Sequence, residues 1–195
     1  MSKPETIMID ADYLRVMLLF AGYGDFRNYL NGVAIQGQYM IATNGHILAA
    51  CKLEKNSGID AIIPTMEIST ALAFNKKKHL RKNVTETIEL TASRIGNINY
   101  VPIEGKFPDW RRVIPKEVRL SKEGKMTFNS KYLSILNKVC KLTGKNSNYA
   151  ICFTQSETDG VAIIHTNNKD FVFVMTPILI DGLKDLTLPE WVKKC

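Results

Sequence analysis

The sequence lacks the residue groupings on which catalytic and metal sites depend. Its four cysteines lie far apart without a CxxC pair, and its three histidines are equally scattered, which argues against a zinc site or a disulfide framework. No catalytic triad and no glycine-rich phosphate loop is evident. We therefore expect no catalytic residue, no metal and no cofactor, and an enzyme is the least favoured class of function.

Long apolar runs are also missing. The N-terminus, MSKPETIMID, has no apolar stretch of the kind found in a signal peptide, and no run approaches the roughly 20 residues of a membrane span. The 195 residues are 45% hydrophobic and 23% charged, an ordinary globular composition that suits one large or two small domains. We expect a cytoplasmic protein with no membrane partner.

Acidic residues are absent between Glu67 and Glu86, in a chain of formal net charge +7. Basic residues crowd this stretch, namely Lys76, Lys77, Lys78, Arg81 and Lys82. Lys131 and Lys138 add positive charge to a later predicted helix. A solvated helix surface explains such lysines without any function, whereas a phosphate-facing surface would bind DNA in a salt-dependent way.

The apolar pattern repeats three times as strand, helix, strands, at roughly 55 to 65 residues per unit. The first unit has a predicted helix over residues 12–20, capped by Asp10 or Asp12, and strands over 29–35, 39–43 and 46–53. The second has a helix through 66–74 with Pro64 in its first turn, and strands over 87–91, 94–99 and 99–103. The third has short strands at 118–120 and 126–128, a helix over 130–142, and strands over 149–154, 161–166 and 171–177.

The segment 105–115 contains Pro108 and Pro115, which fix φ and remove a backbone donor. The two prolines therefore predict a stiff connector between the second and third units. Such a connector suits a site of recognition, but the segment taken by itself favours an ordinary proline-bounded loop with Trp110 in the core.

Five ordered segments resemble the bacterial β sliding clamp, the processivity factor of the replicative DNA polymerase. They are Arg27-Asn28-Tyr29-Leu30-Asn31-Gly32, residues 42–49 (ATNGHILA), residues 107–115, Phe128-Asn129-Ser130-Lys131-Tyr132, and Phe173-Val174-Met175. The resemblance implies an α+β DNA clamp fold of about three modules, with antiparallel sheets and helices on one face. It also implies that residues 1–115 form a complete domain, 116–180 half a domain and 181–195 a tail, with the family's first domain absent.

The resemblance places a pocket for client peptides between the complete domain and the half domain. The positions that match its walls are Leu30, Thr43, Gly45, His46, Leu48, Pro108, Arg112, Val113, Asn129, Tyr132, Phe173, Val174, Met175 and Pro177. Apolar walls with a few polar edges would hold an extended peptide through side-chain anchors and backbone hydrogen bonds. His46 is expected to be a wall or hydrogen-bonding residue and not a base, because no nucleophile or carboxylate accompanies it in these segments.

Some positions depart from the family pattern. Asn44 stands where an Asp is usual and Ile47 where an Arg is common, and Met175-Thr176-Pro177 replaces a Met-Pro-Met type of ending. Arg27 and Tyr29 match DNA-facing positions of the family, although Asn28 replaces an aromatic residue. In the tail, Asp185, Leu186, Thr187 and Leu188 resemble the clamp-binding motif, Gln-Leu-x-Leu followed by an apolar residue; a packing strand is the other explanation.

Two functions from different classes remain open. In the first, the chain is a reduced clamp that surrounds or contacts duplex DNA as a homo-oligomer and tethers a DNA polymerase or another clamp-binding protein through its linear peptide. In the second, it is an open interaction module that competes with or regulates the host sliding clamp.

Overall fold

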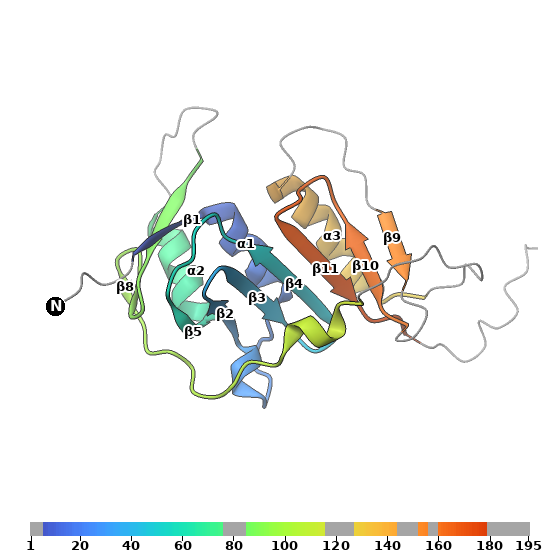
Figure 1. Cartoon of the computed structure of the whole chain (residues 1–195), viewed down its shortest axis with the longest axis horizontal. Helices are drawn as coiled ribbons and strands as arrows, with labels where there is room; N and C mark the ends of the chain where they lie inside the picture. The colour runs from blue at the N-terminus through green and yellow to red at the C-terminus, as the bar shows by residue number, and fades with distance from the viewer. Residues whose placement is uncertain (1–5, 76–84, 116–126, 144–151, 156–159, 179–195) are drawn as a thin grey trace, which may run out of the picture.

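The computed structural model describes residues 6–75, 85–115, 127–143, 152–155 and 160–178. Its strands form a four-stranded sheet in the order β1-β6-β7-β8 and a seven-stranded sheet in the order β5-β2-β3-β4-β11-β10-β9, with every pair antiparallel (Figure 1). The strands are β1 Ile7–Asp10, β2 Gly32–Gln36, β3 Tyr39–Thr43, β4 Ile47–Lys52, β5 Asp60–Pro64, β6 Thr87–Leu90, β7 Arg94–Ile95, β8 Ile98–Asn99, β9 Cys152–Gln155, β10 Ala162–His165 and β11 Phe171–Met175. The helices are α1 Ala11–Phe20, α2 Thr65–Phe74 and α3 Ser130–Thr143, with short 3-10 turns η1 Asn28–Leu30 and η2 Trp110–Val113.

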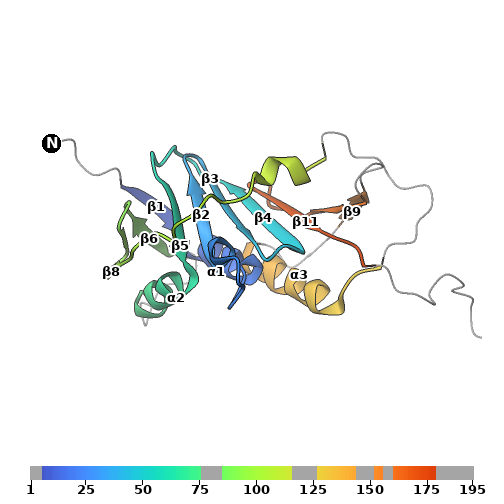
Figure 2. The same cartoon turned by 90° about the horizontal axis from the view of Figure 1, so that it is seen from below.

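All three helices lie on one side of the sheets, and η2 lies on the other side (Figure 2). On α1, Leu14, Met17 and Phe20 are fully buried, and they follow the i, i+3 spacing of an apolar helix face. Asp10 is the N-cap of this helix, because its Oδ1 accepts a hydrogen bond of 2.8 Å from the Asp12 amide. The predicted α+β class, with antiparallel sheets and helices on one face, is confirmed.

The first two units are interlocked. Strand β1 precedes α1 but pairs with β6, and β5 precedes α2 but pairs with β2. The first strand of each unit thus belongs to the sheet of the other unit. The two units therefore do not form separate domains. Several predicted strands differ from the structure. Residues 28–30 form the turn η1 ahead of β2. The prediction over 94–99 falls on the two short strands β7 and β8 with a turn between them, and the strand predicted over 99–103 does not continue beyond Asn99.

The third unit joins the first through the sheet. Strand β11 pairs with β4 over five residues, and α1 packs beneath this junction. The Phe20 and Phe173 rings stack with centroids 5.2 Å apart, and the Tyr13 hydroxyl donates a 2.6 Å hydrogen bond to Asp170. Burial is the main reason why the pKa of Tyr13 lies well above its usual value. The seven-stranded sheet therefore crosses the predicted domain boundary at residue 115, and the boundaries themselves stay a prediction.

Several sequence predictions fall outside the described residues. They are the strand at 118–120 and the starts of those at 126–128 and 149–154, the basic residues Lys76, Lys77, Lys78, Arg81 and Lys82, and the tail motif Asp185–Leu188. Among the described helices, none has both the length and the apolar character to cross a membrane.

Candidate functional site

A row of side chains crosses five strands on the face of the large sheet that lies opposite the helices. The strand register places Thr43 against Leu48, Leu48 against Val174, Val174 against Ile163 and Ile163 against Thr154. Residues in register share a face of the sheet. This row forms a floor, mainly apolar, that begins in the first unit and continues into the third.

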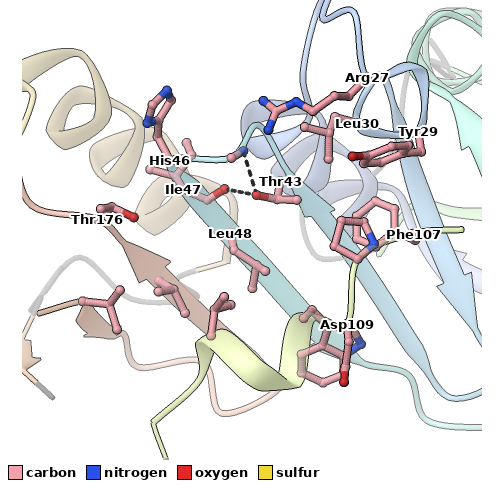
Figure 3. A pocket seen from close by; sticks show the side chains of 16 residues that line it. Arg27, Tyr29, Leu30, Thr43, His46, Ile47, Leu48, Phe107, Asp109 and Thr176 are labelled. Carbon is pink, nitrogen blue, oxygen red and sulfur yellow. Dashed lines mark hydrogen bonds between the residues drawn. The ribbon is translucent and has the colours of Figure 1, made fainter. Parts of the chain in front are cut away.

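The turn between β3 and β4 forms one end of this floor (Figure 3). The Thr43 hydroxyl donates to the Ile47 carbonyl at 2.7 Å and accepts from the Gly45 amide at 3.0 Å. Gly45 has φ +89°, a conformation that L side chains rarely adopt. The His46 carbonyl accepts a 2.9 Å hydrogen bond from the Thr176 amide, so the turn is also fixed to the end of β11.

The connector that contains η2 forms the opposite wall. Trp110 is buried and its Nε1 donates to Gln36 Oε1 at 3.1 Å. The Arg111 guanidinium lies 4.9 Å from the Tyr39 ring centroid and 4.3 Å from that of Trp110, within the range of cation–π contacts. These contacts hold the connector against β2 and β3, and thereby position Phe107 and Pro108 at the site.

Arg27 lies at the rim, beside the turn (Figure 3). Its Nε and Nη2 donate to the two carboxylate oxygens of Asp25 at 3.0 and 2.8 Å. The hydrogen bonds from Arg27 lower the pKa of Asp25 to about 2, so this carboxylate is ionised at neutral pH. A Cβ placed on Gly45 would be 3.0 Å from Arg27 Nη2, which means that the guanidinium packs directly over the glycine.

Together these elements enclose a cavity of about 260 Å³. It is lined by Arg27, Tyr29, Leu30, Thr43, Gly45, His46, Ile47, Leu48, Phe107, Pro108, Asp109, Trp110, Val113, Val161, Val174 and Thr176. In the described part of the chain, no group of three or more His, Cys, Asp or Glu side chains could hold a metal ion. The arrangement suits non-covalent binding of an elongated, mainly apolar ligand.

Most of the predicted pocket residues meet at this cavity. Leu30, Thr43, Gly45, His46, Leu48, Pro108, Val113 and Val174 all line it. The residues expected at the pocket that do not line it are Arg112, Asn129, Tyr132, Phe173, Met175 and Pro177. Tyr132 still lies close by, since its ring stacks on that of His46 with centroids 6.1 Å apart.

The placement of Phe173 and Met175 as pocket walls is wrong for a simple geometric reason. Successive side chains of a strand point to opposite faces, so Val174 faces the cavity while Phe173 and Met175 are fully buried on the helix side. Arg111 and Arg112 are both exposed, but it is the Arg111 guanidinium that packs on the aromatic rings, and Arg112 lines no part of the cavity. Strict alternation from Val172 to Thr176 could have revealed both Val174 and Thr176 in the sequence.

The remaining cavity residues were missed or expected elsewhere. Arg27 and Tyr29, expected to face DNA, line the cavity, while Lys131 and Lys138 are exposed on α3. Phe107, Asp109 and Trp110 belong to the connector, and Val161 precedes β10. No sequence spacing links Val161 to Leu48, because their proximity depends on the pairing of β4, β11 and β10.

Comparisons with known proteins bear on the fold of the chain. A scan against protein-family models gives no match, and no curated protein matches the chain. Solved structures do match. A DNA polymerase sliding clamp from Pseudomonas aeruginosa superposes with a TM-score of 0.64 at 18% identity, covering 92% of this chain and 68% of the clamp. The chain has the DNA clamp fold.

Two further clamps lead to the same assignment. The Helicobacter pylori β clamp bound to a DNA ligase peptide gives a TM-score of 0.65 at 15% identity, and the DNA polymerase III β subunit from Thermotoga maritima gives 0.62 at 15%. Each covers 92% of this chain, which spans 67% of either protein. The clamp fold expected from the five sequence segments is therefore confirmed.

Proposed function

We propose that this chain is a sliding-clamp-like protein of DNA replication or repair whose cavity binds the linear peptides of DNA polymerases and related proteins. The observation that carries the proposal is the continuous floor of Leu48 and Val174, enclosed by the proline-bounded connector and the Thr43–Ile47 turn. An apolar cavity with few polar groups at its rim suits a short extended peptide. The H. pylori clamp bound to a DNA ligase peptide supports the same class of ligand.

The proposed role involves no chemistry on the ligand. His46 is exposed and its ring stacks on Tyr132, while its backbone carbonyl accepts from Thr176. Among the described residues lining the cavity, the carboxylate of Asp109 accepts from the Arg111 amide and serves as the cap of η2. These polar groups are used to hold the site together, which fits recognition by a non-enzymatic protein.

Binding of a fluorescent peptide Gln-Leu-Thr-Leu-Phe, followed by anisotropy, tests the peptide proposal. We expect saturable binding by the wild-type chain and at least a tenfold loss in Leu48→Ala, because a central apolar contact typically contributes over 1 kcal/mol to such interfaces. Val172→Ala is the matched control, since Val172 lies on the same face of β11 but outside the cavity. Absence of wild-type binding, or equal loss in both variants, would contradict the proposal.

The helix side is the proposed DNA-facing surface. On α3, Lys131, Lys138 and Lys141 are exposed and the helix contains no acidic residue. Replacing these three lysines with glutamine should weaken binding to a 30-base-pair duplex and lower its salt dependence, because fewer counterions are released. If the affinity for the duplex and its salt dependence are unchanged, the proposed DNA-facing surface is wrong, while the proposed peptide site is unaffected.

A homo-oligomer that encloses DNA is the proposed assembly. Strands β8 and β9 lie at opposite ends of the described structure (Figure 1). Each is an edge strand, β8 of the four-stranded sheet and β9 of the seven-stranded sheet. Exposed sheet edges favour pairing with another chain. Native mass and retention on closed circular DNA test this assembly: a stable monomer that slips off would favour instead the open module that competes with the host clamp.

A further inference from the structure

The loop between α1 and η1 exposes two aromatic side chains and ends at Arg27, which lines the cavity. Tyr23 is 93% exposed and Phe26 is 89% exposed, which is unusual for two aromatic residues so close in the chain. The loop extends past the ends of β2 and β3 (Figure 1). The Arg27 guanidinium, which lines the cavity, lies 5.3 Å from the Phe26 ring centroid. Phe26 therefore lies beside the rim of the pocket, and Tyr23 is three residues away on the same loop.

Hydrogen bonds hold this loop in one conformation. The Asn31 side chain accepts from the Asp25 amide at 2.9 Å and donates to the Asp25 carbonyl at 2.8 Å. At its base the Gly22 amide donates to the Leu30 carbonyl at 2.7 Å. Gly24 has φ +65°, and a Cβ there would meet nothing within 4 Å, so the apex of the loop is open. An ordered loop presents its side chains at little entropic cost on binding.

Charge distinguishes between two kinds of partner. A nucleic-acid strand would need free cations beside the aromatic rings. The loop supplies none, because Arg27 is held by both carboxylate oxygens of Asp25 and the two charges cancel. A neutral surface of Tyr, Phe and a paired Arg has instead the composition of a protein-binding hot spot.

We propose that Tyr23 and Phe26 form a second anchor for the protein client, taking an apolar or aromatic side chain that flanks the peptide segment held in the cavity. This inference rests on the proposed function, because it assumes that a client peptide occupies the cavity beside Arg27. The flanking residue of the client contacts the Phe26 ring, beside the ion pair of Asp25 and Arg27. Clients with the same core motif are thereby discriminated by the residue next to it.

The test uses three fluorescent peptides and the full chain. The first is Gln-Leu-Thr-Leu-Phe, and the other two add Gly-Ser-Trp at the amino or the carboxyl end. We expect one extended peptide to bind about fivefold more tightly than the core peptide, as one aromatic contact allows. In Tyr23→Ser/Phe26→Ser this gain disappears, while the affinity for the core peptide stays the same.

The control is Met66→Ser/Phe74→Ser on α2, which removes two side chains that are 70% and 75% exposed and line no part of the cavity. It should keep the gain in full. A gain that survives Tyr23→Ser/Phe26→Ser, or no gain from either extension, overturns the second anchor. If the wild-type chain fails to bind even the core peptide, the proposed function fails as well. Loss of binding to a 20-nucleotide oligothymidylate in Tyr23→Ser/Phe26→Ser, with peptide affinities unchanged, would overturn the inference in favour of base stacking.

Discussion

Leu48 and Val174 lie directly opposite each other in the pairing of β4 and β11, and both face the cavity. One belongs to the first unit of the chain and the other to the third. Their pairing means that the cavity floor and the junction between these units are the same structure. Changes that weaken the junction should therefore also weaken ligand binding, and the neighbouring positions allow the two effects to be separated.

Phe173→Ala should chiefly lower the stability of the chain, whereas Val174→Ala should chiefly lower its affinity for the core peptide. Phe173 is fully buried and stacks on Phe20 and Phe171, so its loss should lower the free energy of unfolding by about 3–5 kcal/mol. Val174 faces the cavity, so Val174→Ala should chiefly weaken binding of the core peptide. Urea unfolding and peptide anisotropy measure the two quantities. If the two variants lose equal stability and bind the core peptide with equal affinity, the assignment of Phe173 and Val174 to opposite faces of β11 is wrong.

Arg111→Ala should weaken peptide binding more than Arg112→Ala. Both side chains are exposed, but the Arg111 guanidinium packs on the Tyr39 and Trp110 rings and holds the connector, with about 0.5–1 kcal/mol expected for each exposed cation–π contact. Arg112 lines no part of the cavity. Limited proteolysis of residues 100–115 should also become faster in Arg111→Ala. A larger effect from Arg112 would restore the expectation drawn from the sequence resemblance.

Arg27→Gln should raise the pKa of Asp25 from about 2 toward its ordinary value, because the hydrogen bonds from Arg27 cause most of the depression. The sign follows from linkage. A carboxylate whose pKa is lower in the folded than in the unfolded chain stabilises the fold at any pH above its unfolded-state pKa. This stabilisation is lost as the pH falls through the folded-state pKa. Carbon-detected NMR titration of the Asp25 carboxyl measures the midpoint. A midpoint that is unchanged in Arg27→Gln would disprove the pairing.

Gly45→Ala should destabilise the site more than Gly24→Ala. Both glycines have positive φ, which costs roughly 1–3 kcal/mol for other residues, but only at Gly45 would the new Cβ also press on Arg27. Thermal unfolding of the two variants gives the comparison. Adding Arg27→Ala to Gly45→Ala should recover part of the difference; no recovery would mean that backbone strain alone is responsible.

Much of the local structure could be predicted from the sequence. The apolar periodicity of residues 12–20 and 130–142 predicted α1 and α3 almost to their ends, and Asp10 was one of two expected caps. The ordered segments from Arg27 to Met175 predicted the fold. The face of each pocket residue was less certain, because family positions were carried over without applying the alternation that separates Val174 from Phe173 and Met175.

The sequence by itself determined the α+β class and the helix positions, since these depend on local periodicity and on which residue types are present. The tertiary structure decided which side chains form the cavity. Thr43, Leu48 and Val174 become neighbours only when β4 pairs with both β3 and β11 in one register. That register is a long-range property, because it depends on which face of each strand is buried against α1, and no short stretch of sequence encodes it.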